Sequence, residues 1–152
     1  MIILNRIDSR LIHGQVIEVW LPHLNVRRVV VVDDEAAADK LTKAAFGLVM
    51  PPKVEILTTP VSQTDFAALE KDAVRTLVLF RTVRAAERAR ELGLPNGTLN
   101  VGNVHSAPGK VALNRSVFLD AEESQALSRL RSGGMKVVLQ AVPADTPMPL
   151  PT

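Results

Sequence analysis

Residues 6–16 place several side chains that can handle a phosphate on one short stretch of chain, which reads Arg-Ile-Asp-Ser-Arg-Leu-Ile-His-Gly-Gln-Val. His13 carries an imidazole, and a neutral imidazole is a nucleophile near neutral pH. Arg10, three residues earlier, offers a planar fork of N–H donors that suits phosphate oxygens. Gly14 leaves space for a group to approach the backbone. These residue types predict a loop in which a histidine accepts a phosphoryl group, or at least a loop that binds an anion.

Two features around this histidine leave its role open. Asp8 can hold Arg10 by a charge-assisted hydrogen bond, or it can orient the imidazole of His13. The helix that we expect after Gly14 begins with free backbone N–H groups, which favour an anion. The alternative interpretation is that His13 only caps this helix, and the residue types do not decide between the two.

Short runs rich in Val, Ile and Leu alternate along the chain with segments of helical periodicity. The runs cover residues 2–7, 28–32, 54–58, 76–80, 98–101, 117–119 and 136–142. Such continuous apolar runs are typical of strands that are buried on both faces. The alternation predicts the α/β class, with a single open, doubly wound sheet and right-handed crossovers. Ligands bind such a sheet at the carboxyl ends of its strands, and the histidine loop follows the first strand.

Signals for helix starts and stops lie between these runs. Asp33 is a predicted N-cap, and the helical pattern after it continues up to Pro51. Thr82 and Asp120 are predicted to cap two later helices. The tail is rich in proline, so we expect residues 146–152 to be extended or disordered and their removal to leave stability unchanged.

Composition excludes several classes of function. The chain has 152 residues, which fits one domain, and it has no cysteine, which excludes disulfides and thiolate metal sites. The formal net charge of +2 and the aromatic content of 3% argue against a surface that binds nucleic acid. No stretch reaches about 18 apolar residues, and the N-terminus does not resemble a signal peptide. We therefore expect a soluble protein of the cytoplasm.

The motifs of nucleotide-dependent enzymes and of hydrolases are missing. No G-x-G-x-x-G, P-loop or G-x-S-x-G sequence occurs, and the three histidines, at positions 13, 23 and 105, do not have the spacing of metal ligands. We expect no cofactor and no metal. Arg81 follows the fourth run and His105 follows the fifth, so both are candidates for the edge of the site. The alternative for His105 is a loop histidine bonded to backbone.

Residues 6–16 closely resemble the active-site loop of the IIB subunits of the mannose/fructose/sorbose class of the bacterial sugar phosphotransferase system (PTS). Further segments resemble that family in the same order, namely Val31–Glu35, Pro51–Val54, Leu79–Arg81, Leu99–Asn103, Ser116–Leu119 and Val142-Pro143. The resemblance covers residues 1–145, which it identifies as one PTS IIB domain of this class.

This resemblance implies a mostly parallel sheet of about seven strands with helices on both faces. It also implies an enzyme, a protein-Nπ-phosphohistidine–sugar phosphotransferase. In that family a phosphohistidine of a IIA partner phosphorylates the loop histidine, and a sugar then receives the group. The phosphoryl acceptor falls on Nδ1 of His13, and the arginine that stabilises the phosphate falls on Arg10. Asp8, Gly14 and Gln15 match the motif, and we assign the orientation of the imidazole to Asp8 and phosphate binding to Gly14 and Gln15.

The partners that the resemblance implies are a separate IIA phosphocarrier, the membrane subunits IIC and IID, and a sugar. Contact with IIC and IID implies a cytoplasmic protein at the periphery of the inner membrane. Two other interpretations stay open. One is a regulatory protein that uses the phosphohistidine as a signal without a sugar step, and the other is an anion-binding module without catalysis. The sequence does not name the sugar or fix the oligomeric state, and a homo-oligomer is among the alternatives.

Overall fold

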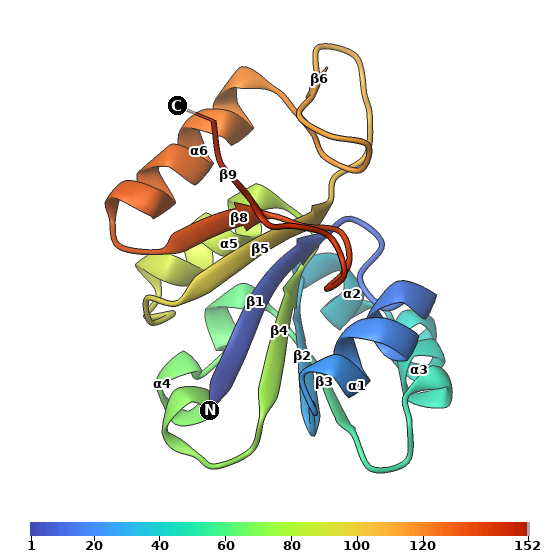
Figure 1. Ribbon diagram of the computed structural model, residues 1–152. Coiled ribbons are helices and arrows are strands. Elements are labelled where there is room, and N and C mark those ends of the chain that lie inside the picture. Colours follow the sequence, from blue (N-terminus) through green and yellow to red (C-terminus); the bar gives the residue numbers. More distant parts are fainter. Residues whose placement is uncertain (152) are drawn as a thin grey trace.

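The computed structural model describes residues 1–151 and contains one seven-stranded sheet (Figure 1). Its strands are β1 (Ile2–Asp8), β2 (Arg28–Val32), β3 (Glu55–Thr59), β4 (Thr76–Phe80), β5 (Thr98–Asn103), β8 (Lys136–Leu139) and β9 (Met148–Pro149). Their order across the sheet is β3-β2-β4-β1-β5-β8-β9. Neighbouring strands run parallel except β8 and β9, which are antiparallel. The structure confirms the predicted open, mostly parallel α/β sheet of about seven strands.

Helices cover both faces of this sheet, as a doubly wound fold requires. One face carries η1 (Gln15–Trp20, a π-helical segment), α1 (Leu21–His23), α2 (Asp34–Ala38) and α3 (Lys40–Val49), and the other carries the 3₁₀ turn η2 (Val61–Gln63), α4 (Phe66–Lys71), α5 (Val83–Glu91) and α6 (Ala121–Ser132). Alternate residues of each strand separate the two cores. Val29 and Val31 of β2 pack with the first group of helices, whereas Val30 and Val32 pack with the second.

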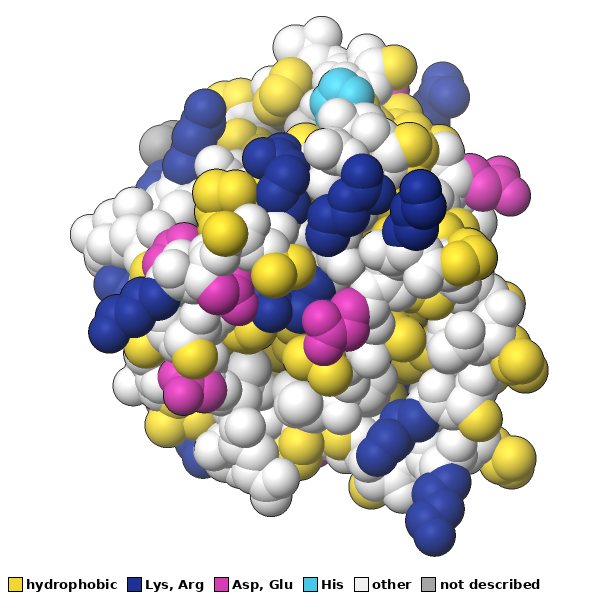
Figure 2. All heavy atoms as spheres, turned by 90° about the horizontal axis from the view of Figure 1, so that it is seen from below, with side chains coloured by type: hydrophobic (Ala, Val, Ile, Leu, Met, Phe, Trp, Pro, Cys, Tyr) yellow, Lys and Arg dark blue, Asp and Glu magenta, His cyan; other side chains and the backbone are white. Residues whose placement is uncertain are grey.

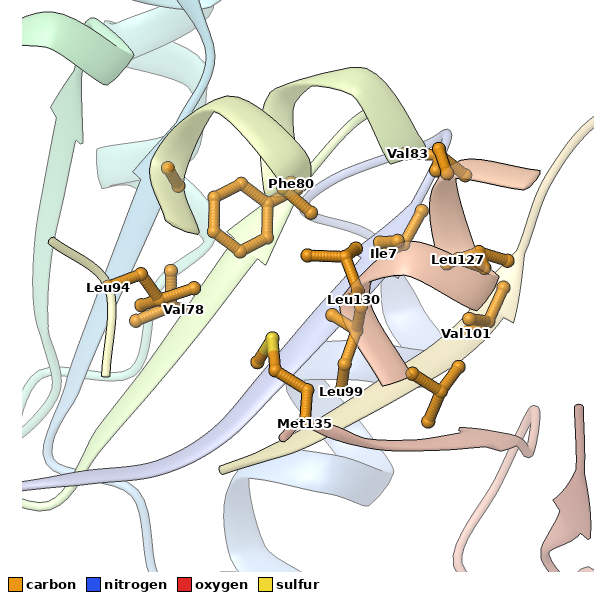
Figure 3. Close-up of a cluster of buried hydrophobic side chains, with 14 of the residues drawn as sticks. Ile7, Val78, Phe80, Val83, Leu94, Leu99, Val101, Leu127, Leu130 and Met135 are labelled. Atoms are coloured by element: carbon orange, nitrogen blue, oxygen red, sulfur yellow. The ribbon is translucent and has the colours of Figure 1, made fainter. Parts of the chain in front are cut away.

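The larger core lies between the sheet and the helices α5 and α6. In Figure 3, Ile7 of β1, Phe80 of β4 and Leu99 of β5 point toward this core, which Leu127 and Leu130 of α6 close from the opposite side. All five side chains are buried. Because β1, β4 and β5 are adjacent and covered on both faces, their carboxyl ends are held in fixed positions at one edge of the sheet.

Side-chain caps define where the helices begin. The hydroxyl of Thr82 accepts a hydrogen bond from a backbone N–H of α5 at 3.0 Å, and Asp120 forms a reciprocal capping box with Glu123, which confirms both predicted caps. The single helix predicted before the Pro-Pro pair is divided at Asp39. The Asp39 carboxylate accepts from the N–H of Leu41 at 3.0 Å and starts α3 as a separate helix. A capping aspartate therefore interrupts a continuous apolar pattern.

One predicted strand of the main sheet is placed elsewhere. In the structure, β7 (Phe118–Leu119) pairs with β6 (Val111–Ala112) in a separate two-stranded sheet. The main sheet takes its seventh strand from the tail, where Met148 pairs with Leu139 and Pro149 pairs with Val138. Proline is tolerated there because β9 is an edge strand. The backbone N–H that proline lacks is not needed on the side that faces no neighbouring strand.

The predicted alternative of a disordered tail is wrong, whereas that of an extended tail agrees with β9 (Met148–Pro149). The side chain of Leu150 is 4% exposed and belongs to the larger core, and Nη1 of Arg131 donates a hydrogen bond to the Leu150 carbonyl at 2.8 Å. The last residue of the predicted tail, Thr152, lies outside the described residues. The buried side chain of Leu150, the hydrogen bond from Arg131 and the pairing of β8 with β9 together fix the tail.

Deleting residues 146–152 is therefore expected to destabilise the protein. Exposing a buried leucine costs roughly 1.5–3 kcal/mol, and in a chain of this size that loss lowers the melting temperature by about 4–10 °C. Thermal unfolding of the chain cut after Asp145 and of Leu150→Ser measures the effect. Met148→Ser is the control, because the Met148 side chain is already 39% exposed. Unchanged melting temperatures in both test variants would show that the tail contributes nothing.

Charges of both signs are interspersed on the face seen in Figure 2. Lys and Arg side chains form a row across this face, and Asp and Glu side chains lie directly beside that row. This mixture agrees with the formal net charge of +2. No helix within residues 1–151 is both long and apolar enough to cross a bilayer.

Candidate functional site

The histidine loop follows β1 directly, at the carboxyl edge of the sheet. The backbone N–H of Ser9 donates to the carbonyl of Asn103 at 2.8 Å, which ties the loop to the end of β5. Leu11 has a φ of 56°, in the left-handed region that residues other than glycine rarely adopt, and its side chain is buried. Leu11 therefore anchors the loop in the core, while Arg10 and Gly14 stay exposed on either side of it.

Asp8 and His13 form the contact at the centre of the site. Nε2 of His13 lies 2.7 Å from Oδ2 of Asp8. The Asp8 side chain is fully buried, whereas the His13 side chain keeps 12% of its surface exposed. The imidazole thus links a buried carboxylate to the surface of the protein.

Hydrogen bonds and a positive charge keep Asp8 ionised in spite of its burial. Burial alone would raise the pKa of Asp8, but the hydrogen bond with His13, the charge of Arg6 and a hydrogen bond from Asn103 outweigh it, and the pKa is lowered. Arg6 Nη2 lies 3.1 Å and Asn103 Nδ2 lies 2.9 Å from the same Oδ2 atom. The backbone N–H of Arg10 donates to Oδ1 at 3.0 Å. Asp8 is therefore a carboxylate that accepts hydrogen bonds at both oxygens.

The guanidinium of Arg6 is fully buried beside this carboxylate. Its Nε and Nη2 atoms donate to Asp8, at 3.3 and 3.1 Å. Nη1 donates to Oδ1 of Asn100 at 2.5 Å, and Nη2 donates to Oε1 of Gln15 at 2.9 Å. Burial lowers the pKa of Arg6, and the neighbouring Asp8 charge opposes that change. A guanidinium stays protonated in proteins, so Arg6 and Asp8 form a buried ion pair.

Backbone carbonyls and an aromatic ring complete the surroundings of Arg6. Its Nη1 donates to the carbonyl of Gln140 at 3.1 Å, and its Nη2 donates to the carbonyl of Ala141 at 3.0 Å. The Arg6 guanidinium carbon lies over the ring of Trp20, 5.0 Å from its centroid, which is a cation–π arrangement. Trp20 Nε1 donates to the same Ala141 carbonyl at 2.9 Å. Every N–H-bearing nitrogen of Arg6 is therefore hydrogen-bonded within the protein.

Gly102 of β5 leaves the space that this guanidinium fills, because a Cβ added there would overlap it. Gly102→Ala is expected to lower the free energy of unfolding by about 1–3 kcal/mol, the usual cost of overfilling a packed site. Urea unfolding measures this loss. Gly47→Ala is the matched control, because a Cβ at Gly47 has nothing within 4 Å and lies in the helix α3. Equal stability of the two variants would contradict the close fit of Arg6 against Gly102.

The structure separates the predicted loop residues into two groups. Asp8, His13 and Gln15 share one hydrogen-bond network, in which Gln15 Oε1 accepts from Asn103 as well as from Arg6. Arg10 and Gly14 are exposed, and Gly14 has an ordinary helical φ of −52° with open space around it. Of the two contacts considered for Asp8, its side chain bonds the imidazole, and it meets residue 10 only through the backbone N–H.

Arg81 and His105 lie after strands of the same sheet edge but outside this network. Nη2 of Arg81 donates to Oδ2 of Asp33 at 3.0 Å, and this hydrogen bond raises the pKa of Arg81. Asp33 in turn caps α2. His105 is exposed in the loop after β5. Within the described part of the chain, no hydrogen bond links either residue to Asp8 or His13.

Sequence reasoning missed Arg6, Asn100, Asn103 and the two carbonyls after β8. A signal for Arg6 was present, because it stands two residues before Asp8 and both side chains therefore point to one face of β1. A charge inside a buried strand needs a partner of opposite sign. The asparagines interrupt an apolar run, which is a weaker signal of the same kind. Backbone carbonyls carry no signal in the residue types.

This arrangement leaves one ring nitrogen of His13 available for chemistry. Because the Asp8 carboxylate can only accept hydrogen bonds, the proton between the two groups belongs to Nε2. Nδ1 then carries the lone pair, and within residues 1–151 it has no hydrogen-bond partner. Over the same residues, no three side chains of His, Asp or Glu converge as metal ligands would. The loop therefore offers a nucleophilic nitrogen, with the uncommitted cation of Arg10 three residues away.

Comparisons of the sequence and of the fold with known proteins all match the same group of proteins. The sequence model of the family described as "PTS system sorbose subfamily IIB component" matches residues 2–152. A curated relative, the mannose-specific EIIAB component of the PTS of Escherichia coli K12, is 33% identical over 93% of this chain, and the chain spans 45% of that protein's length. The sorbose-specific EIIB component of Lacticaseibacillus casei is 31% identical over 95% of this chain and 90% of its own. The crystal structure of the N-acetylgalactosamine-specific IIB component 1 from Escherichia coli has a TM-score of 0.92 and 29% identity, and it covers 99% of this chain and 100% of its own.

Proposed function

The chain belongs to the PTS system sorbose subfamily of IIB components, and from this premise we propose that it carries a phosphoryl group on His13 from a IIA phosphocarrier to a sugar. The relatives of this chain are components of sugar phosphotransferase systems, so a phosphotransferase role in the general sense follows from the family. The single observation that carries the finer proposal is the 2.7 Å contact between His13 Nε2 and the ionised Asp8.

That contact supports Nδ1 of His13 as the atom that is phosphorylated. Asp8 holds the proton on Nε2 and so keeps the lone pair on Nδ1. In the first step the phosphorus–nitrogen bond on the IIA histidine breaks as a phosphorus–Nδ1 bond forms. In the second step that bond breaks as phosphorus bonds a sugar hydroxyl, whose proton leaves to solvent or to a base. Both donor and acceptor of the first step are imidazole nitrogens, so this exchange lies near equilibrium.

The catalytic work is then alignment of the two imidazoles and compensation of the phosphoryl charge. The exposed Arg10 supplies the compensating cation, because Arg6 has committed all its donors inside the protein. The open space around Gly14 leaves room for the phosphoryl oxygens beside the loop. We place the reaction in the cytoplasm, with IIC and IID as the membrane subunits that present the sugar.

Arg10→Ala is expected to fold normally and to accept the phosphoryl group about ten to a hundred times more slowly. The estimate follows from roughly 1.5–3 kcal/mol for a hydrogen bond to a charged group, converted to a rate. Single-turnover transfer from phospho-IIA measures it. Arg27→Ala is the control, since Arg27 is also exposed but precedes β2, at the opposite edge of the sheet. An unchanged rate would remove Arg10 from the mechanism.

The experiment that tests the function starts from a purified phospho-IIA protein of the same PTS class. It is incubated with this protein in excess EDTA without nucleotide, and NMR of the product assigns the phosphorylated nitrogen. The expected result is phosphate on Nδ1 of His13. Absence of transfer, or transfer that depends on added magnesium, would contradict the proposal. Adding membranes that contain IIC and IID, together with sugar, then separates a transport enzyme from a purely regulatory phosphoprotein, because only the former makes sugar phosphate.

A further inference from the structure

We propose that the C-terminal strap, residues 140–151, positions the phosphoryl acceptor: through Arg6 and Asp8 it fixes which nitrogen of His13 carries the proton. The consequence for transfer rests on the proposed function, but the effect on the proton position does not. Figure 1 shows the strap returning from the end of β8 across the carboxyl edge of the sheet, beside the loop that follows β1.

The strap contacts the site through two backbone carbonyls. Those of Gln140 and Ala141 accept hydrogen bonds from Nη1 and Nη2 of Arg6, at 3.1 and 3.0 Å. A guanidinium without solvent exposure needs an acceptor for each N–H, because an unpaired buried donor destabilises the folded state. The Gln140 carbonyl is one of the two acceptors of Nη1, and the Ala141 carbonyl is a third acceptor at Nη2, beside Asp8 and Gln15. The two carbonyls therefore help to hold Arg6 in its present orientation.

Both ends of the strap are fixed, so the carbonyls have defined positions. Near the site, Trp20 Nε1 donates to the Ala141 carbonyl at 2.9 Å. At the far end, Met148 pairs with Leu139 in the sheet, and Leu150 is buried with its carbonyl bonded to Arg131. Trp20 and Leu150 are thus the two anchors of a segment that otherwise consists mostly of exposed residues.

Arg6 transmits the position of the strap to the histidine. Nε and Nη2 of Arg6 donate to Oδ2 of Asp8, the same oxygen that contacts Nε2 of His13. If the strap detaches, water reaches the guanidinium and Arg6 is no longer held against this oxygen. The Asp8 carboxylate then keeps only the donors of Asn103 and of the Arg10 backbone N–H. Its orientation toward Nε2 is less defined, and the imidazole can carry its proton on either nitrogen. Trp20 and the strap are positioning groups in this scheme, because they act through Arg6 and touch no reacting atom.

The test is the proton position on His13, read from the ¹⁵N chemical shifts of both ring nitrogens at a pH where the ring is neutral. Two variants release the strap: Trp20→Phe keeps an aromatic ring and removes the Nε1 donor, and a chain cut after Asp145 removes the far anchor. The unchanged protein is expected to show His13 almost wholly protonated at Nε2. Both variants are expected to show a mixture that approaches that of His105, an exposed histidine in the same spectrum.

Transfer from phospho-IIA gives a second readout. We expect kcat to fall about tenfold in both variants with KM for phospho-IIA within twofold, because the strap orients the nucleophile, and one tenth of the rate corresponds to about 1.4 kcal/mol. Leu150→Met is the conservative control, since it keeps an apolar side chain at the far anchor and is expected to retain the proton position.

The possible results distinguish a failure of this positioning proposal from a failure of the proposed function. If Trp20→Phe folds and its His13 proton stays on Nε2, the strap has only a structural role and the proposal is wrong, even where the cut chain fails to fold. The other outcome is that the variants share the His13 proton between both ring nitrogens, while the unchanged protein accepts no phosphate from IIA. In that case the positioning proposal stands and the proposed function fails.

Discussion

His13→Ala is expected to abolish phosphorylation of this protein by phospho-IIA. Nδ1 of His13 is the nitrogen that its contact with Asp8 leaves unprotonated, and the hydroxyl of the loop residue Ser9 is buried. The measurement is the acid-labile phosphate that remains on the protein after incubation with phospho-IIA. The variant is expected to fold, because the imidazole lies at the surface end of the network and Asp8 keeps its hydrogen bonds from Arg6, Asn103 and the Arg10 backbone N–H.

Two matched controls accompany this variant. His23→Ala and His105→Ala remove the other two histidines, both of which are exposed. Both are expected to accept phosphate at the rate of the unchanged protein. Phosphate retained by His13→Ala, or lost in His105→Ala, would contradict the assignment of the acceptor.

Asp8→Asn is expected to have the second-largest effect, because it changes the proton position and breaks the ion pair with Arg6. An amide has one acceptor oxygen, whereas Oδ2 of Asp8 meets donors from Arg6, His13 and Asn103. If the amide nitrogen takes that position, it donates to Nε2 and moves the imidazole proton to Nδ1. A similar exchange in a serine protease slows catalysis about ten-thousandfold, so we expect transfer to fall by about a hundredfold to ten-thousandfold.

Asp8→Asn also tests the buried ion pair through stability. Breaking such a pair by removing one charge costs about 3–5 kcal/mol, and urea unfolding measures that loss. Asp65→Asn is the control, because Asp65 is a helix cap on α4 and asparagine caps equally well. A folded Asp8→Asn variant that transfers within threefold of the unchanged rate would show that Asp8 does not set the proton position.

Several elements of the fold could be predicted from the sequence because their causes are local. Strand β2 is a run of valines, and Asp120 with Glu123 forms a capping box within four residues of each other. The division at Asp39 was missed, although its cause is equally local, because an apolar pattern was given more weight than a capping side chain. The seventh strand was assigned to residues 117–119 and belongs to the tail, because strand pairing depends on which edge is open.

The residues of the candidate site could be found for a similar reason. His13, Arg10 and Asp8 lie within six consecutive residues, so the sequence by itself indicated a loop suited to phosphate and the edge of the sheet at which it lies. It also left two contacts open for Asp8, with Arg10 or with the imidazole. Residue types could not decide between them, because both partners are within reach on a short loop.

Only the tertiary structure decided how the side chain of His13 is held. Asp8 is held by Asn103, which is 95 residues away, and Arg6 is held by a carbonyl at Ala141, which is 135 residues away. Such contacts exist only after β1, β5 and the strap have come together, and one of them involves a backbone group that every residue possesses. The sequence therefore indicated which side chain is the candidate nucleophile, whereas the packed sheet edge decided which of its ring nitrogens carries the proton, because burial and hydrogen bonds together set the charge of Asp8.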